Sequence, residues 1–157
     1  MKLNDLFKDK EVKKLLSASM IRIIEAGRNI EIKGITDDSR KVKPGYIFIA
    51  VKGLEHNGHS FIEQAVENGT ACVVFDINSN YQLPAIKSEK TIFIGLNNSR
   101  RALGLLWASW YGFPSRKLKV IGVTGTDGKT TTTNLIYHVL KIAGEKVGMV
   151  STINARI

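Results

Sequence analysis

The sequence is poor in cysteine and in long apolar runs, and each shortage excludes a class of protein. Cys72 is the single cysteine among 157 residues, so no disulfide can form within the chain. It lies in the apolar run 71–75, which indicates a buried, inert thiol rather than a catalytic one. The longest uncharged run, 102–115, is too short to cross a bilayer and is interrupted by glycine and proline.

The first residues also lack the apolar segment that a secretory signal needs. Residues 1–14 mix charged and apolar side chains within each turn. The apolar fraction of 43% and the charged fraction of 24% are ordinary for a folded globular protein. We therefore expect a cytoplasmic protein with no membrane partner, and we expect a monomer.

Acidic residues are scarce in the last part of the chain. Residues 98–157 hold nine Lys and Arg against two Asp and Glu, whereas residues 1–97 hold 14 against 12. A basic field of this kind steers anionic substrates toward a site. The basic residues are scattered rather than interleaved with aromatics along one element, so we expect no nucleic-acid partner.

The three histidines do not predict a metal site. His56 and His59 flank Asn57 and Gly58 in an expected loop, and the sequence offers no third ligand nearby. His138 is distant in the sequence. We expect no metal bound by this pair.

The most informative pattern is residues 118–133, LKVIGVTGTDGKTTTT. An apolar strand that runs through a loop into a helix directs several backbone N–H groups at one spot, where the helix dipole favours negative charge. Gly125 and Gly128 let the backbone approach phosphate oxygens. Lys129 can reach the β- and γ-phosphates, and the Thr130 hydroxyl can ligate Mg²⁺. The pattern predicts a nucleoside triphosphate site.

One deviation narrows the type of nucleotide site. The strict phosphate-loop pattern has glycine where Val123 stands here. The glycine spacing also differs from that of dinucleotide-binding folds, and no acidic residue follows where a ribose-binding carboxylate should. These differences argue against a nicotinamide or flavin site.

The residues around this loop predict a βαβ unit. The run 118–123 is nearly all apolar, as in parallel strands buried on both faces. Apolar residues then recur at helical spacing from 132 to 143, and 146–151 reads as a second strand. The order strand, phosphate loop, helix and strand is the one that such a nucleotide site requires.

The first 97 residues predict a small α/β domain, because helices alternate with short apolar strands. We expect strands at 30–36, 46–51, 71–75 and 91–94, and helices through residue 26 and at 60–68. Polar loops follow the first two strands, at 37–40 and 53–61. Such loops can form a ligand site at the edge of a sheet, but taken alone these residues favour solvated turns.

Three segments of the sequence resemble the Mur ligases. In chain order they are ITDDSRKVKPGYIFIAVKG, NGHSFIEQAVENGTACVVF and VIGVTGTDGKTTT. The Mur ligases are the ATP-dependent enzymes that extend the peptide of UDP-N-acetylmuramic acid during peptidoglycan synthesis. The family does not demand glycine at the position of Val123. Asp38-Ser39-Arg40 resembles most the members that add the third residue, to UDP-N-acetylmuramoyl-L-alanyl-D-glutamate, because the D-alanyl-D-alanine-adding members more usually carry threonine in place of Ser39.

The resemblance implies site residues and a reaction. ATP and Mg²⁺ are the implied cofactors, and Lys129 and Thr130 are the implied catalytic residues, Thr130 as a Mg²⁺ ligand. In the complete enzyme, the substrate carboxylate attacks the γ-phosphate, and the incoming amine displaces the acyl phosphate. The ATP loop would comprise Gly125, Thr126, Asp127, Gly128, Lys129, Thr130 and Thr131. The UDP group of the UDP-N-acetylmuramoyl-peptide substrate would contact Ser39, Arg40, Leu54, Glu55, His56 and Asn57.

The resemblance also implies that the chain holds only part of such an enzyme. Residues 1–97 would be the UDP-sugar-binding domain and 98–157 the incomplete start of the ATPase domain, with the amino-acid acceptor site missing. We expect no ligase turnover from this chain alone. The alternatives are a non-catalytic UDP-sugar- or nucleotide-binding fragment, a D-alanyl-D-alanine-adding member, or a folylpolyglutamate-synthetase relative. The last lacks the domain that carries Asp38-Ser39-Arg40.

Overall fold

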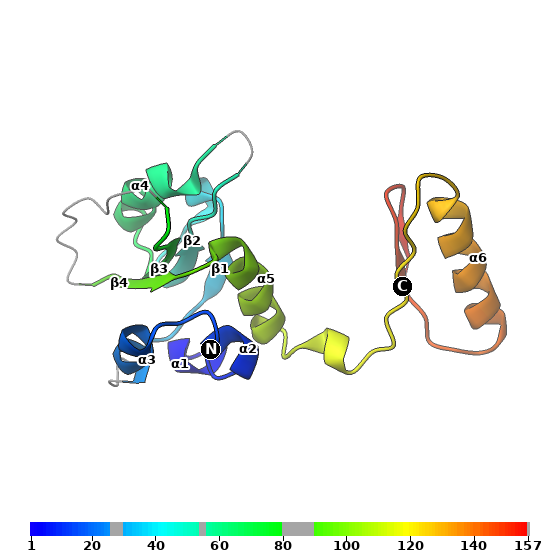
Figure 1. Cartoon of the computed structure of the whole chain (residues 1–157), viewed down its shortest axis with the longest axis horizontal. Helices are drawn as coiled ribbons and strands as arrows, with labels where there is room; N and C mark the ends of the chain where they lie inside the picture. The colour runs from blue at the N-terminus through cyan, green and yellow to red at the C-terminus, as the bar shows by residue number, and fades with distance from the viewer. Residues whose placement is uncertain (26–29, 54–55, 80–89, 157) are drawn as a thin grey trace. The chain divides into compact units, whose positions relative to one another are not determined.

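The structure, a computed structural model, describes residues 1–25, 30–53, 56–79 and 90–156. The chain divides into two compact units, Met1–Lys117 and Leu118–Ile157 (Figure 1). The units are described separately below.

The first unit is built on a parallel sheet of four strands in the order β1-β2-β3-β4. The ends of each strand lie within about two residues of the ends that the apolar runs predict. The exception is the first strand, which begins later than predicted. The predicted α/β class is therefore confirmed, and the structure shows that the sheet is parallel. The strands are β1 (Gly34–Thr36), β2 (Tyr46–Ile49), β3 (Cys72–Asp76) and β4 (Ile92–Leu96).

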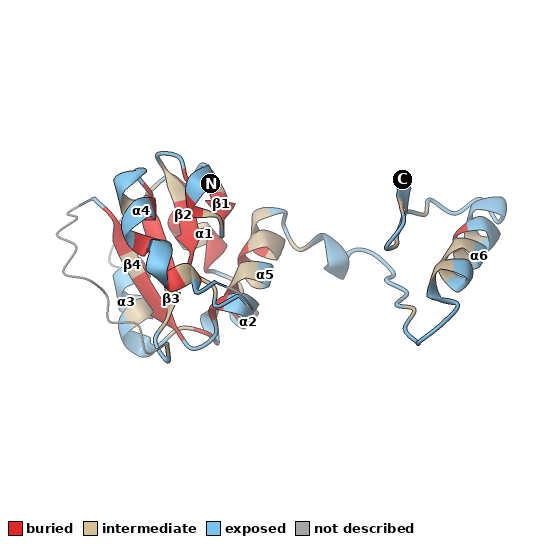
Figure 2. Cartoon of the chain, turned by 90° about the horizontal axis from the view of Figure 1, so that it is seen from above, coloured by how far each residue is buried: buried red, intermediate tan, exposed pale blue. Residues whose placement is uncertain are grey.

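Helices cover both faces of this sheet (Figure 2). Alternate residues of a strand point to opposite faces, so Ile47 and Ile49 join one cluster of buried side chains while Phe48 joins the other. The second cluster packs under α4 (Ile62–Glu67), which follows the short 3₁₀ turn η2 (Gly58–Phe61). The first cluster is covered by α1 (Leu3–Leu6), α2 (Lys10–Lys13), α3 (Ala18–Glu25) and α5 (Ser99–Trp110).

Cys72 lies in the middle of this core. Its side chain is fully buried, and burial raises the pKa of the thiol. The prediction that Cys72 is buried is confirmed.

Helix α5 belongs to the first compact unit, although the sequence predicts a domain boundary at residue 97. The Asn98 side chain accepts a hydrogen bond from the Arg101 N–H at 2.8 Å and caps the helix. Ala102 and Leu106 are buried in the same cluster as β2 and β3. This packing extends the first compact unit to Lys117, beyond the short turn η3 (Pro114–Arg116).

The second unit consists of α6 (Lys129–Ile142) and a hairpin of β5 (Met149–Val150) with β6 (Ala155–Arg156). The helix and the strand near 146–151 agree with the prediction, but residues 118–123 form no strand, so the expected βαβ order is not present. A buried parallel strand needs neighbours to hydrogen-bond with, and β5 and β6 pair only with each other among the described residues. The side chain of Val120 is 73% exposed.

Within the described residues, none of the helices combines the length and the apolar character required to cross a bilayer.

Candidate functional site

The two polar loops of the first unit lie at one edge of the sheet. Strands β1 and β2 are adjacent and parallel, so the segments that follow Thr36 and Ile49 leave from the same edge. The first loop contains the 3₁₀ turn η1 (Ser39–Lys41), and the second runs through Asn57 into η2. Ligands of open α/β sheets bind at this carboxyl edge.

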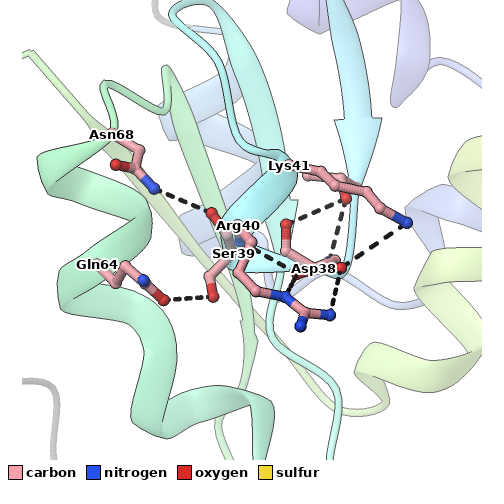
Figure 3. A network of polar contacts seen from close by, with 7 residues as sticks. Asp38, Ser39, Arg40, Lys41, Gln64 and Asn68 are labelled. Carbon is pink, nitrogen blue, oxygen red and sulfur yellow. Dashed lines mark hydrogen bonds and ion pairs between the residues drawn. The ribbon is translucent and has the colours of Figure 1, made fainter.

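Helix α4 and its C-cap residue Asn68 hold Ser39 through two hydrogen bonds (Figure 3). The Ser39 hydroxyl donates to Oε1 of Gln64 at 2.6 Å, and the Ser39 carbonyl accepts from Nδ2 of Asn68 at 3.0 Å. Ser39 is itself buried. Its hydroxyl oxygen therefore has a fixed position, and its proton is donated to Gln64.

Arg40 is folded onto the neighbouring carboxylate of Asp38. Its Nε and Nη2 atoms each lie 2.9 Å from one Asp38 oxygen, and the same carboxylate accepts the Arg40 backbone N–H. These hydrogen bonds, above all that from the guanidinium, lower the pKa of Asp38 to about 2. The guanidinium is largely exposed, so water screens the ion pair and an anionic ligand can compete for Arg40.

The second loop is closed at its base by backbone contacts. The Gly53 N–H donates to the His56 carbonyl at 2.9 Å, and the Gly58 N–H donates to the Val51 carbonyl at 3.0 Å. A side chain at Gly58 would bring its Cβ to 2.6 Å from the Val51 oxygen, so only glycine fits there. Two predicted site residues of this loop, Leu54 and Glu55, lie outside the described residues.

Two anchors of this loop escaped the sequence analysis. His59 is fully buried, with Nδ1 at 2.8 Å from Oδ1 of Asn57 and Nε2 accepting the Asp76 N–H at 3.0 Å. Arg100 of α5 donates from Nη2 to the Lys52 carbonyl at 2.6 Å. The Asn-x-His spacing before a helix could have indicated that His59 contacts Asn57, because Asn57 caps η2 by accepting the His59 N–H. Nothing local in the sequence indicates the contact of Arg100.

The predicted phosphate loop leads into α6 as the sequence indicates. Gly128 precedes the helix with φ 73°, and Gly125 has φ 148°, both in the region that favours glycine. The ammonium of Lys129 donates to the carbonyls of Gly125 at 2.6 Å and Thr126 at 2.9 Å. Lys129 is thus held against the loop by neutral carbonyl groups.

The start of α6 has the chemistry that a phosphate chain requires. No side chain caps the helix and no acidic residue lies in its first turn, so its N–H groups can face an anion. The Thr130 hydroxyl makes no hydrogen bond to the described part of the chain and can serve as one Mg²⁺ ligand. Asp127 precedes this turn and Thr131 lies within it. The described residues contain no group of three or more His, Cys, Asp or Glu side chains that could hold a metal ion.

Comparison with known proteins gives matches to both units, in the order of the sequence. Residues 31–111 match the family described as "Mur ligase family, catalytic domain", and residues 123–157 match the "Mur ligase middle domain". The first match contains the loops of Ser39 and Asn57, and the second contains the phosphate loop and α6.

Curated relatives and a solved structure agree with these matches. A UDP-N-acetylmuramoyl-L-alanyl-D-glutamate–2,6-diaminopimelate ligase of Clostridium tetani is 41% identical over 143 residues, which are 91% of this chain and 29% of that protein. The ligase of the same name from Aquifex aeolicus is 45% identical over 126 residues, 80% of this chain and 24% of that protein.

The crystal structure of MurF from Acinetobacter baumannii matches 82% of this chain and 28% of its own, with a TM-score of 0.53 and 29% identity. The chain thus spans less than a third of the length of each of these proteins. The agreement of both family matches with the arrangement of the two loops and the phosphate loop shows that the chain belongs to the Mur ligase family.

Proposed function

We propose that the chain supplies the first part of an ATP-dependent ligase that adds the third amino acid to UDP-N-acetylmuramoyl-L-alanyl-D-glutamate. The observation that carries this proposal is the identity of 41% over 91% of the chain with a 2,6-diaminopimelate ligase acting on that precursor. The identity with MurF, the D-alanyl-D-alanine-adding ligase, is lower, at 29%. The third-residue ligase is therefore favoured over the D-alanyl-D-alanine-adding one.

In this proposal the first unit binds the UDP group at the carboxyl edge of its sheet. Ser39 presents a fixed hydroxyl oxygen, and Arg40 offers a guanidinium that can leave Asp38 for a diphosphate oxygen. His56 and Asn57 contribute from the second loop, together with Leu54 and Glu55.

The second unit binds ATP with Mg²⁺ through residues 125–131. Lys129 exchanges two carbonyl partners for the β- and γ-phosphates, which are stronger partners because they are charged. ATP supplies the phosphoryl group that activates the substrate carboxylate. The residues of this chain bind and orient its phosphates, a role that accounts for most of the protein's part in phosphoryl transfer.

The Ser39→Ala variant tests the proposal by calorimetric titration with UDP-N-acetylmuramoyl-L-alanyl-D-glutamate. Removal of one buried hydrogen-bonding group should weaken binding about tenfold. Ser109→Ala is the matched control, because Ser109 is also buried but lies in α5. Affinity that is unchanged in a folded Ser39→Ala variant would refute the assignment of Ser39.

A further inference from the structure

His59 connects the loop that follows β2 to the carboxyl end of β3. It lies in η2, is completely buried, and contacts Asn57 of the loop through Nδ1 and the end of β3 through Nε2. Burial of this kind is costly for an imidazole unless both ring nitrogens are paired. The hydrogen bonds to Asn57 and Asp76 pair both ring nitrogens.

The partners of the ring fix the position of its proton. The backbone N–H of Asp76 can only donate, so Nε2 must be the acceptor in that hydrogen bond. Nδ1 then carries the proton and donates to Oδ1 of Asn57. Burial lowers the pKa of His59, with the Asp76 charge opposing it, which agrees with a neutral ring.

The same contacts fix the orientation of the Asn57 amide. Its Oδ1 receives both the Nδ1 proton of His59 and the His59 backbone N–H, at 2.8 and 3.2 Å. The exposed Asn57 side chain consequently turns its oxygen toward the protein and its NH₂ group away from His59. An NH₂ group at this edge can only donate hydrogen bonds.

The other anchors of the loop do not act on Asn57 in this way. Arg100 holds the carbonyl of Lys52, and Gly53 pairs with the carbonyl of His56. They fix the path of the backbone at the start of the loop. In the part of the chain that the structure describes, the hydrogen bonds of the Asn57 side chain are with His59.

We propose that His59 is a positioning residue, which in its Nδ1-protonated form orients the Asn57 amide so that its N–H donors face oxygen atoms of a bound UDP group. This inference rests on the proposed binding of the UDP group at this edge. Asn57 makes the contact, and His59 acts through it.

Two substitutions of His59 separate its two hydrogen bonds. In His59→Asn, the side-chain NH₂ lies near the former Nδ1 and can still donate to Asn57. In His59→Gln, the side-chain oxygen can reach the former Nε2 position and accept the Asp76 N–H, but the donor to Asn57 is lost. Both variants remove the ring, so the loss of packing is similar.

The probe is UDP, titrated into the full 157-residue chain by calorimetry, with thermal unfolding to verify the fold. We expect His59→Gln to weaken UDP binding about tenfold and His59→Asn to remain within about threefold of the wild type. Equal affinities for both variants and the wild type would overturn the proposal.

A third variant keeps the test valid if the His59 variants do not fold. Asn57 is exposed, and Asn57→Asp retains the acceptor for His59 while replacing the outward NH₂ by a carboxylate oxygen. UDP binding should fall at least about tenfold, and unchanged binding would contradict the role of the amide donors.

The proton position on His59 can be measured without any ligand. A long-range proton–nitrogen NMR spectrum of the wild type should show Nδ1 protonated and Nε2 bare, and the opposite tautomer would overturn the inference. If the wild type shows this tautomer but binds no UDP, the proposed UDP site fails together with the role of Asn57 in it.

Discussion

At the residue scale, one polar side chain of each candidate site, Ser39 and Lys129, is held by partners within the chain. The Ser39 hydroxyl donates to Gln64, and the Lys129 ammonium donates to two carbonyls of its own loop. Positions fixed in this way reduce the entropy that must be lost when a ligand binds. For Lys129, binding also requires exchange of its present partners.

Lys129→Met should weaken ATP binding at least about tenfold, because it removes the cation that would face the β- and γ-phosphates and keeps a side chain of similar length. Calorimetric titration with ATP and Mg²⁺ measures this change. Lys141→Met is the control, since Lys141 lies in the last turn of the same helix and contacts Tyr137. Equal losses in the two variants would indicate a nonspecific effect of charge.

The residues that position the UDP-group site were harder to predict than the residues expected to form it. Ser39 and the phosphate loop are visible as local patterns. Gln64 and Asn68, in contrast, lie 25 and 29 positions from the serine they hold. His59 was judged only as a metal ligand, because its burial depends on the packing of η2 against β3.

At the element scale, a short ion pair connects the start of α2 to η3. The Asp9 carboxylate caps α2 by accepting the Glu11 N–H, and both its oxygens accept from Arg116, at 2.6 and 3.0 Å. The Arg116 guanidinium also lies 3.8 Å from the centre of the Phe113 ring. This contact fastens the end of the first unit to its N-terminal helices.

This contact predicts a pH dependence of stability. The hydrogen bond from Arg116 is the main cause that lowers the pKa of Asp9 from 3.8 to about 2. Because the pKa is lower in the folded state, the contribution is complete above pH 3.8 and disappears as the pH falls toward 2.

Thermal unfolding of the wild type and of Arg116→Gln measures this contribution. We expect the wild type to be more stable near neutral pH by a small margin, since the pair is exposed, and the margin to vanish near pH 2. A difference between the two proteins that is the same at both pH values would contradict the role of Asp9.

The elements differ in how well the sequence predicts them, for a physical reason. Helix α6 was predicted because its hydrogen bonds join residues four apart, so that local sequence determines it. The strand expected at 118–123 was not found, because a strand exists only through its pairing with another segment. An apolar run indicates that a segment can pair, without indicating the partner.

At the scale of the whole molecule, the two units differ in how they bury apolar side chains. The first unit encloses the side chains of its sheet under helices on both faces. In the second unit, Ile142 is 87% exposed and Val150 is 82% exposed. Large exposed apolar surfaces lower stability and promote association, so we attribute most of the folding free energy to the first unit.

The class and order of the units could be predicted from the sequence, whereas the extent of the first compact unit depends on packing. Alternating strands and helices and the Gly-Lys-Thr step determine an α/β domain followed by a phosphate loop. The division falls at residue 117 instead of 97 because α5 packs on the first unit. The sequence pattern of α5 predicts an apolar face but does not determine which unit that face packs on. The side chains of Ala102 and Leu106 show that it packs on the first.

The central claim is that the first unit binds the UDP group and the second binds ATP. An NMR titration of the full chain with UDP-N-acetylmuramoyl-L-alanyl-D-glutamate tests it most directly. We predict shifts of the backbone amides of Ser39, Arg40, His56 and Asn57 and none in residues 125–131, with the reverse pattern for ATP and Mg²⁺. The absence of shifts at the sheet edge, or shifts by the UDP ligand confined to the phosphate loop, would contradict the account.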